Sequence, residues 1–355
     1  KNNKIKFFVF TGTDEIVFNQ KNYKNLNIIK SIFLNKKGFT SYIKKICSIV
    51  FKKYDPILLL LLNKFSINIL SHYKPINGVK NATWFPDFQH EYYPNFFSKK
   101  EIMLRNKMYI NYINHSDTLI VSSKSSKKDL LKFYKKYKIR NKIRNIKVLN
   151  FVPAVNFSLI KSKSKLKKYL NINQKYIFVP NQFWIHKNHD CVIEALKILK
   201  DKGKSIQCIF TGNNFDHRNP NHFNMMMDKI KKLRLKKLIK YKGVVPYEVI
   251  INLMYYSDAV VNPSLFEGWS TTVEEAKIFN KKILLSNIPV HLEQNPSLGF
   301  FFNPKNPLEL SLKIENSIKN VTKKEKLAYL KSKYEIKKKN FGKKYLSLIK
   351  SIELT

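Results

Sequence analysis

The sequence predicts an α/β protein of two doubly wound domains, in which helices cover both faces of a parallel sheet. Three observations lead to this prediction. The 355 residues are too many for one ordinary hydrophobic core and suit two domains. Short apolar runs alternate with helical segments along the second half, a rhythm typical of parallel sheets. The most distinctive residues follow directly after predicted strands, where ligands bind in such sheets.

In the first half, short apolar runs predict strands, and longer runs with a helical apolar period predict helices. The apolar runs that suggest strands are 5–10, 67–70, a run that ends near Phe85, 119–122 and 146–152. The expected helices are 42–51, 56–65, 100–113 and 125–134, the last with a serine cap. Residues 86–94 are expected to form a polar loop between Phe85 and the helix at 100–113.

The second half shows the strand–helix rhythm more clearly. The expected strands are 176–179, 206–211, 238–242, 259–262 and 283–286, and the expected helices are 190–200, 223–233, 247–256 and 272–279. The pattern predicts an N-terminal domain, a C-terminal domain and a lysine-rich helical tail at 1–157, 158–322 and 323–355. Pro153 and the lysine- and serine-rich residues 161–168 suit a linker between the domains.

Composition indicates a globular protein of a reducing compartment. The chain is 44% hydrophobic, and its longest aliphatic run, 57–62, is far shorter than the roughly 20 residues that span a bilayer. Residues 1–10 are basic but lack the long apolar stretch of a signal peptide. Cys47, Cys191 and Cys208 are odd in number and widely spaced, which suits neither a disulfide framework nor a zinc site. A cytoplasmic location is therefore expected.

The formal net charge of +43 has two interpretations. It could attract anionic lipid, nucleic acid or a phosphorylated ligand. It could also be compositional drift, because lysine, asparagine and isoleucine crowd every segment. Only five of the 67 basic residues are arginine, the usual reader of bases and phosphates, so we expect no nucleic-acid partner. Peripheral association with an anionic membrane surface stays open.

The strongest motif lies between Pro263 and Ala276 and has the form strand, tight turn at Gly268, helix. Thr271 and Glu274 have capping-box spacing, which predicts that the helix begins near Thr271. Free backbone N–H groups and the positive dipole end at that helix start suit a phosphate. Glu267 before the turn and Glu275 within the first turns can line one crevice. Glu274 could serve only as the cap.

The spacing of Glu267 and Glu275, within Phe-Glu-Gly and Glu-Ala flanks, resembles the paired-glutamate motif of glycosyltransferase family 4, retaining enzymes of the GT-B fold. The resemblance implies two Rossmann-like domains that face each other across a cleft. It implies that Glu275 binds the ribose of a nucleotide-sugar donor and that Glu267 contacts the transferred sugar. The backbone of Gly268, Trp269, Ser270 and Thr271 would hold the distal phosphate.

A second motif, at 180–189, follows the strand at 176–179. Lys187 is well placed there to neutralise a diphosphate. Members of the family usually have an arginine five positions before this lysine, where the chain has Gln182, which donates hydrogen bonds without charge. The departure resembles a variant of bacterial polysaccharide enzymes. His186 and His189 are expected to make local hydrogen bonds rather than to bind metal.

A third motif, at 86–94, resembles a segment of the acceptor half of the family, in which a histidine faces the donor sugar. This role is carried to His90, with Asp87 as a second acceptor-side residue. The alternative for His90 is a loop histidine that titrates near neutrality. Arg105, on the next helix, is a candidate for an acceptor or phosphate contact.

Turns at the ends of two further strands would line the nucleotide pocket. In the family these turns lie beside the nucleotide, which assigns donor binding to Gly212, Val244 and Val245. The beginning of the chain fits less well, because Gly12 is the only early glycine and family members open with a strand and a glycine-rich turn. We expect that this first strand is missing, with residues 7–13 as a degenerate version of the turn as the alternative.

The resemblance implies a retaining glycosyltransferase in which Lys187, Gln182 and the helix start near Thr271 stabilise the departing diphosphate. The donor would be a GDP- or UDP-linked sugar, and the acceptor a glycan or a lipid-linked glycan of a surface polysaccharide. No aspartate-rich motif is present, so neither metal nor cofactor is expected. The location would be cytoplasmic, with peripheral contact at the inner face of the plasma membrane.

Two rival functions remain. The first is a non-catalytic or truncated transferase scaffold that binds anionic membranes or polyanions, which the charge favours. The presence of Glu267, Glu275 and Lys187 together argues against it. The second is an epimerase or phosphorylase on the same fold, which the residues around Glu267 disfavour.

Overall fold

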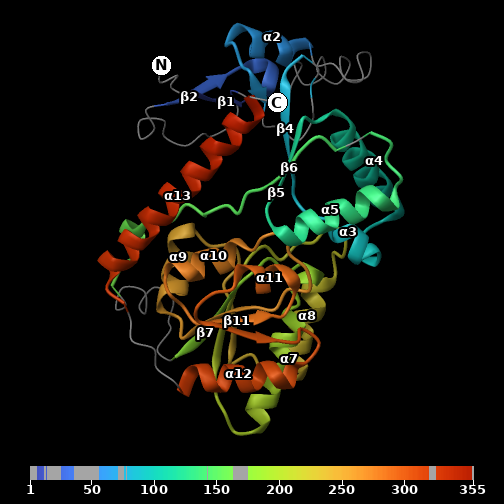
Figure 1. The fold of residues 1–355 in the computed structure, drawn as a ribbon. Helices are drawn as coiled ribbons and strands as arrows, with labels where there is room; N and C mark the ends of the chain where they lie inside the picture. The colour runs from blue at the N-terminus through green and yellow to red at the C-terminus, as the bar shows by residue number, and fades with distance from the viewer. Residues whose placement is uncertain are drawn as a thin grey trace.

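The computed structural model describes residues 6–11, 13, 25–35, 56–70, 76, 78–141, 143–162, 175–319 and 325–353. The helix predicted at 42–51 and most of the predicted linker, together with Gly12 and Cys47, lie outside these residues. The two interpretations of the 7–13 turn therefore stay predictions. Strands of the described chain form three parallel sheets, of six, four and two strands (Figure 1).

The C-terminal domain is built on the six-stranded sheet. Its strands are β7 (Tyr176–Pro180), β8 (Gln207–Thr211), β9 (Ile239–Tyr241), β10 (Ala259–Asn262), β11 (Ile283–Ser286) and β12 (Gly299–Phe302). Their order is β12-β11-β10-β7-β8-β9, and every pairing is parallel. The chain starts in the middle at β7, winds outward through β9, and returns at β10 to wind the other way. The predicted doubly wound sheet is confirmed, and β7 and β10 flank its topological switch point.

Helices cover both faces of this sheet because successive strand residues point to opposite sides. The helices are α7 (His189–Asp201), α8 (His222–Lys232), α9 (Tyr247–Tyr256), α10 (Thr271–Ile278), α11 (Pro289–Gln294) and α12 (Pro307–Lys319). Ile177 and Val179 pack in one core with residues of α7, α8 and α12, whereas Phe178 packs in the other with residues of α9 and α10. The elements α11, β12 and α12 were not among the predicted helices and strands.

The N-terminal domain has a sheet of four parallel strands, β3 (Ile69–Leu70), β4 (Lys80–Phe85), β5 (Thr118–Val121) and β6 (Ile146–Val148), in sequential order. A parallel pair, β1 (Phe7–Thr11) and β2 (Leu26–Lys30), lies beside it. The helices are α2 (Pro56–Lys64), α3 (Gln89–Tyr92), α4 (Lys99–His115) and α5 (Lys124–Lys136). Short 3-10 turns occur at Ile32–Leu34, Pro94–Phe96, Phe157–Leu159 and Ile185–Lys187.

Local capping explains where the two long helices of this domain begin. Ser98 and Glu101 form a capping box at the start of α4, and the Ser123 side chain caps α5, which confirms the predicted serine cap. Residues 86–94 contain α3 and are not the polar loop that was predicted, because Phe88, Gln89 and His90 are buried under α4 and α5. β6 ends four residues earlier than predicted.

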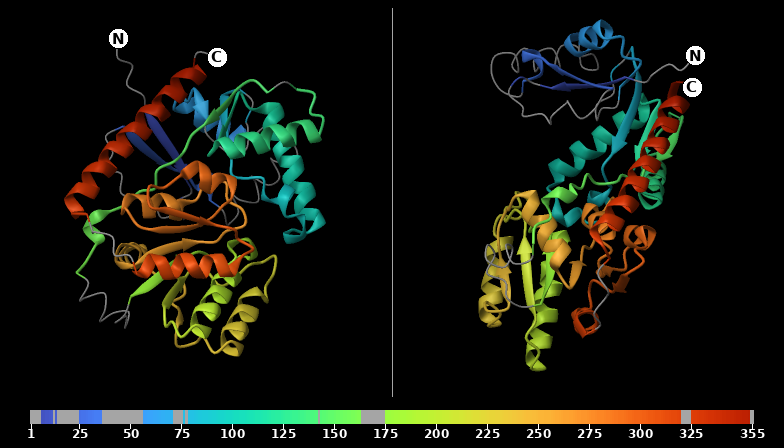
Figure 2. Two further views of the ribbon diagram at one scale, coloured as in Figure 1. Left: turned by 60° about the horizontal axis from the view of Figure 1, so that its bottom comes forward. Right: turned by 90° about the vertical axis from the view of Figure 1, so that its left-hand side faces the viewer.

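The predicted helical tail is α13 (Leu327–Glu353), and it joins the two domains (Figures 1 and 2). Its first turns pack in the C-terminal core through Leu330 and Tyr334. Its last turns pack on the N-terminal sheet, where Ile352 is fully buried beside Ala82 and Ile120. The helix is rich in lysine, and among the described helices none is long and apolar enough to cross a membrane.

Candidate active site

A buried ion pair occupies the topological switch point of the C-terminal sheet. The Lys187 ammonium lies 2.6 Å from Glu267 Oε1, and the Ser264 hydroxyl donates to the same oxygen at 2.7 Å. Lys187 follows β7 and Glu267 follows β10, the neighbouring strands that flank the switch point. The two side chains are only 16% and 10% exposed. The structure therefore joins two residues that the sequence placed at separate strand ends.

A left-handed residue sets the direction of the loop that carries Lys187. Asn188 has φ 56°, a conformation that asparagine tolerates better than most residues, and it separates the 3-10 turn Ile185–Lys187 from α7. Its side-chain amide donates to the carbonyl oxygens of Pro263 (3.0 Å) and Pro304 (2.9 Å). These bonds tie the Lys187 loop to the segment that carries Glu267.

Two buried histidines lie beside this pair. Burial raises the pKa of the Glu267 carboxyl, but the Lys187 ammonium outweighs burial and holds that pKa well below its usual range, at about 2. Burial and the nearby Lys187 lower the pKa of His186 to about 3, and burial lowers the pKa of His291 to about 4. At neutral pH, Glu267 is therefore ionised while both histidines are neutral.

The α10 helix begins at Thr271 as predicted, but the capping box was a wrong prediction. The Ser270 side chain caps the helix by accepting from Val273 N, and it also accepts from the Asn262 amide at 2.7 Å. Glu274 is buried and forms ion pairs with Lys277 (2.9 Å) and Lys337 (2.5 Å). The sequence could not show that Lys337 of α13 lies beside this carboxylate.

Glu275 is buried next to the turn that follows β9. The Tyr247 hydroxyl, at the start of α9, donates to Glu275 Oε1 at 2.7 Å, and burial raises the pKa of this carboxyl. Tyr247 comes two residues after Val245, and the neighbouring Val244 is 76% exposed. The structure thus places Glu275 against Tyr247, two residues beyond the 243–245 turn, and donor binding by these residues stays a prediction. Tyr247 was missed, although its position directly after Pro246 marks it as the first residue past the turn.

The loops after β7, β8 and β9 pack tightly through Gly212. This glycine has φ 139°, and a Cβ there would lie 2.3 Å from the Asn181 carbonyl oxygen, so a side chain does not fit. Its N–H donates to the Gly243 carbonyl at 2.9 Å. Gln182 lies in the loop after β7 and is exposed. The expected donor residues Gln182 and Gly212 therefore belong to adjacent loops.

Gly268 contacts the N-terminal domain, which the sequence did not indicate. A Cβ at Gly268 would lie 2.4 Å from the Pro86 carbonyl oxygen, next to Asp87. The Gly268 carbonyl accepts from the hydroxyls of Ser122 (3.2 Å) and Ser126 (3.3 Å).

The residues after Gly268 also have partners. Trp269 Nε1 donates to the Phe151 carbonyl at 3.2 Å, and Ser270 N donates to the Gln294 side chain at 3.3 Å. Thr271 is exposed at the helix start. Phosphate binding by the 268–271 backbone stays a prediction.

His90 lies in the aromatic core of the N-terminal domain. It is 1% exposed, its Nε2 is 2.9 Å from Asn106 Oδ1, and its ring meets Tyr109 edge-on. Burial lowers its pKa, so the ring is neutral at pH 7. Asp87 Oδ1 accepts from the Gln89 N–H, and the Arg105 guanidinium lies 4.8 Å from the Phe97 ring centre. The roles assigned to His90, Asp87 and Arg105 stay predictions.

Arg218 lies next to the Lys187 loop and was not singled out from the sequence. Its guanidinium pairs with Asp216 through Nε (2.8 Å) and Nη2 (3.0 Å). It lies 5.1 Å from the ring centres of both Trp184, in the Lys187 loop, and Phe97, in the N-terminal domain. Nη1 donates to the Gln89 side chain at 3.3 Å, again across the domains. The sequence could have drawn attention to Arg218, because it is one of only five arginines among the 67 basic residues and the others are lysine.

The buried histidines and cysteines belong to the core. His189 is fully buried and stacks on Phe183 with ring centres 4.1 Å apart, so it packs in the core rather than serving mainly as a hydrogen-bonding residue. Burial raises the pKa of the Cys191 thiol to about 12, and Cys208 is buried as well. Within the described part of the chain, no group of three or more His, Cys, Asp or Glu residues could hold a metal ion.

Comparison with known proteins agrees with this geometry. The family model "Glycosyl transferases group 1" matches residues 161–334. A glycosyltransferase from Rickettsia africae is similar in structure, with a TM-score of 0.62, 21% identity, and coverage of 93% of this chain and 86% of that one. HepE from Anabaena in complex with UDP has a TM-score of 0.66 and 13% identity over 99% of this chain and 100% of its own.

Sucrose-phosphate synthase from Thermosynechococcus elongatus has a TM-score of 0.62 and 12% identity, and the match covers 98% of this chain and 86% of that one. No curated protein sequence matches the chain. The structural matches establish the GT-B fold, and the family match covers the domain that holds Lys187, Glu267 and Glu275. Residues 161–334 thus match the glycosyl transferases group 1 family, and the chain is a glycosyltransferase of the GT-B fold.

Proposed function

We propose that this glycosyltransferase retains anomeric configuration and transfers a sugar from UDP to a glycan or lipid-linked acceptor bound at the N-terminal domain. The observation that carries the proposal is the Lys187–Glu267 pair at the switch point. A lysine ammonium has three N–H donors, so Lys187 can keep its hydrogen bond to Glu267 while two donors remain for a diphosphate. The α10 N-terminus beyond Ser270 adds its positive dipole end.

The proposed reaction needs no metal ion, and the leaving group of the donor itself takes part in the proton transfer. The bond between the sugar's anomeric carbon and the β-phosphate oxygen breaks, and the acceptor oxygen bonds to the same face of that carbon. The acceptor's proton passes to the departing phosphate oxygen. Lys187 and Gln182 stabilise the charge that develops on the diphosphate, as electrostatic catalysis requires. Ionised Glu267 faces the transferred sugar, and Glu275 binds the ribose hydroxyls.

UDP is the nucleotide that we favour over GDP. Solved structures of HepE contain UDP together with glucose, and UDP-glucose. A role in surface polysaccharide synthesis at the inner face of the plasma membrane is part of the proposal, supported by the Gln182 motif variant and by the net charge of +43. Family 4 membership rests on the Glu267 and Glu275 spacing.

A thermal-shift screen tests the donor pocket. The purified chain is melted with UDP, GDP, ADP and their glucose conjugates, because a ligand that binds only the folded state raises the melting temperature by mass action. We expect a shift with UDP that disappears in Glu275→Ala. Glu335→Ala, an exposed glutamate on α13, is the control and should keep the shift. A folded protein that responds to none of these ligands would instead support the non-catalytic scaffold.

A further inference from the structure

The solvent-facing side of α4 has an unusual composition. Six of its residues are exposed: Lys99, Lys100, Met103, Leu104, Lys107 and Met108. The three apolar side chains among them are 61%, 51% and 37% exposed. Single exposed apolar residues are ordinary, but three on one helix face, interspersed with three lysines and no acid, form an amphipathic patch. We name these six residues the α4 face.

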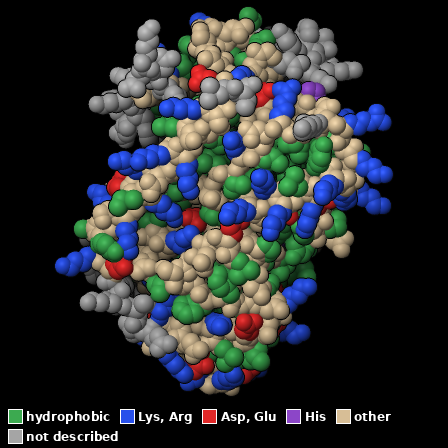
Figure 3. Space-filling view, in the orientation of Figure 1, with side chains coloured by type: hydrophobic (Ala, Val, Ile, Leu, Met, Phe, Trp, Pro, Cys, Tyr) green, Lys and Arg blue, Asp and Glu red, His purple; other side chains and the backbone are tan. Residues whose placement is uncertain are grey.

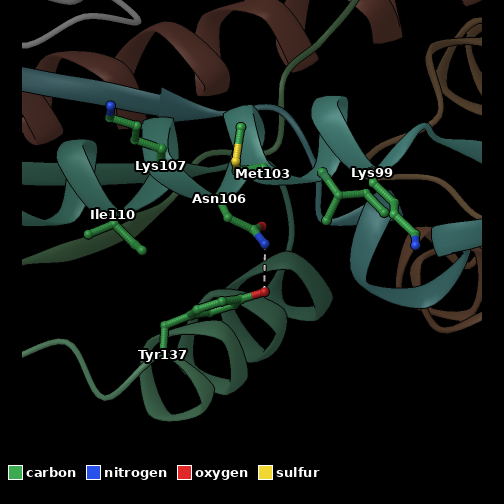
Figure 4. A pocket seen from close by; sticks show the side chains of 7 residues that line it. Lys99, Met103, Asn106, Lys107, Ile110 and Tyr137 are labelled. Carbon is green, nitrogen blue, oxygen red and sulfur yellow. Dashed lines mark hydrogen bonds between the residues drawn. The ribbon is translucent and has the colours of Figure 1, made fainter.

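An apolar groove runs along the edge of the α4 face (Figure 4). Lys99, Ile102, Met103, Asn106, Lys107 and Ile110 form one wall, and Tyr137 at the end of α5 forms the other. The hollow has a volume of about 570 Å³ and is open to the surface. The Asn106 amide donates to the Tyr137 hydroxyl at 2.6 Å across its floor, so the polar groups there already have partners. The groove extends the apolar area beside the α4 face.

The charge around this patch points to an anionic partner. The exposed residues of the neighbouring α5 are Lys124, Lys128, Leu131, Lys132, Lys135 and Lys136, again without an acid. Figure 3 shows Lys and Arg side chains projecting along the side of the molecule where α4 and α5 lie, with hydrophobic side chains between them. A second copy of this chain is a poor occupant, because two such faces would bring like charges together.

We propose that the α4 face docks the enzyme on the surface of an anionic lipid bilayer. Met103, Leu104 and Met108 enter the boundary between headgroups and acyl chains, and Lys99, Lys100 and Lys107 contact lipid phosphates while their methylene stems lie along the apolar layer. A protein partner is less well matched, since tight protein interfaces centre on tryptophan, tyrosine and arginine, and the exposed residues here include none. The inference does not depend on the donor chemistry.

Vesicle co-sedimentation of the full chain tests the docking surface. The vesicles contain phosphatidylcholine alone or phosphatidylcholine mixed with phosphatidylglycerol, at low and high salt. We expect binding to the anionic vesicles only. Met103→Gln/Met108→Gln should weaken it about tenfold or more because apolar area no longer leaves water. Lys99→Gln/Lys100→Gln/Lys107→Gln should weaken it roughly a hundredfold at low salt.

Helix α13 offers matched controls on another part of the surface. Ile336 and Leu346 are 61% and 39% exposed, close to the 61% and 37% of Met103 and Met108. Ile336→Gln/Leu346→Gln and Lys331→Gln/Lys339→Gln/Lys343→Gln remove the same numbers of apolar groups and charges from exposed positions. Equal melting temperatures and equal UDP shifts would show that all variants fold and keep the donor pocket.

The results of these experiments distinguish an anionic bilayer from the other candidate occupants of the α4 face. Loss of anionic vesicle binding in the two α4 variants, with the α13 variants unchanged, supports the proposal even if the chain binds no nucleotide. Equal losses in the α4 and α13 variants would overturn it in favour of attraction by net charge. Binding unaffected by either α4 variant also overturns it. A change of oligomeric state in Met103→Gln/Met108→Gln, measured by analytical ultracentrifugation, would assign the face to contacts between copies instead.

Discussion

Lys187 and Glu267 lie 80 positions apart in the chain and form the ion pair at the centre of the site. Both side chains are largely removed from water, so each charge depends on the other for its stability. At the scale of single residues, this pair and the buried histidines around it determine how the site responds to substitution and to pH.

Lys187→Met is expected to lower the free energy of unfolding by about 3–5 kcal/mol, because it leaves the Glu267 carboxylate buried without its cation. The same change should reduce kcat of transfer at least roughly a hundredfold, since the departing diphosphate loses its charge partner. Urea unfolding at pH 7 and a nucleotide-release assay measure the two effects.

The double variant Lys187→Met/Glu267→Gln separates stability from catalysis. It should recover most of the lost unfolding free energy, because no unpaired charge remains, while transfer stays lost. A double variant as unstable as the single one would show that Lys187 stabilises the fold by packing rather than by its charge.

The buried histidines predict a loss of stability in mild acid. Burial lowers the pKa values of His186, His189 and His291 to about 3, 3 and 4, below the ordinary value of 6.5. Their contribution is fully present above pH 6.5 and is lost as the pH falls toward 4, because the unfolded chain binds protons that the folded chain does not. The urea midpoint should therefore fall steadily over this range.

The substitution His189→Phe removes one of these titrating groups. Phenylalanine keeps the stack on Phe183 and does not titrate, so the pH slope of the unfolding free energy between 6.5 and 4 should decrease by up to about 1.4 kcal/mol per pH unit, the share of one proton. Identical slopes for the variant and the parent chain would show that His189 binds its proton equally well in the folded and the unfolded chain, so that burial does not lower its pKa.

Among the helices, α5 and α11 make a contact that links the two domains. Glu293 of α11 accepts from the backbone N–H groups of Lys124 (2.8 Å) and Ser125 (3.0 Å) in the first turn of α5. The helix N-terminus is the positive end of the α5 dipole, so the carboxylate is favourable there. With the Gly268 carbonyl and Arg218, this contact holds the two domains together.

Glu293→Ala should loosen the contact between domains by about 1 kcal/mol, because two N–H groups and a dipole end lose their partner. We expect a larger radius of gyration in small-angle X-ray scattering without ligand, and a higher KM for the donor. Leu292→Ala, at the neighbouring exposed position of α11, serves as the control and should change neither quantity. Equal radii for Glu293→Ala and the parent chain would contradict a closing role.

Over the whole molecule, α13 makes the C-terminal end of the chain part of the N-terminal core. Ile352 is 0% exposed and packs with Ala82 and Ile120, and the Lys80 ammonium contacts the carbonyl oxygens of Ile352 (3.2 Å) and Glu353 (2.9 Å). The same helix packs Tyr334 in the C-terminal core. The two domains therefore share α13 as a structural element in addition to their direct contacts.

Ile352→Ala is expected to destabilise the N-terminal domain by about 2–5 kcal/mol through the cavity it leaves. Hydrogen exchange should become faster in β4 and β5, which meet Ile352, while β7 and β8 keep their protection. Uniform loss of protection over both domains would show that they unfold as one unit, and no loss would contradict the packing role of α13.

The sequence by itself determined the C-terminal domain closely. Its strands and helices at 176–286 were predicted within a few residues, because apolar periodicity and turn residues act locally. It also determined which residues follow the strands, and therefore the edge of the sheet at which Lys187 and Glu267 meet. The elements that follow β11, namely α11, β12 and α12, were not predicted.

Only the tertiary structure decided which of these residues are partners. Side-chain hydrogen bonds join Lys187 to Glu267, Tyr247 to Glu275, and Lys337 to Glu274. The partners lie 80, 28 and 63 positions apart in the sequence. Gly268 meets Pro86 from the other domain, and the end of α13 packs on the four-stranded sheet of the N-terminal domain. Local patterns do not encode such pairs, because the contacts form only after two segments fold and their packed surfaces bring distant side chains together.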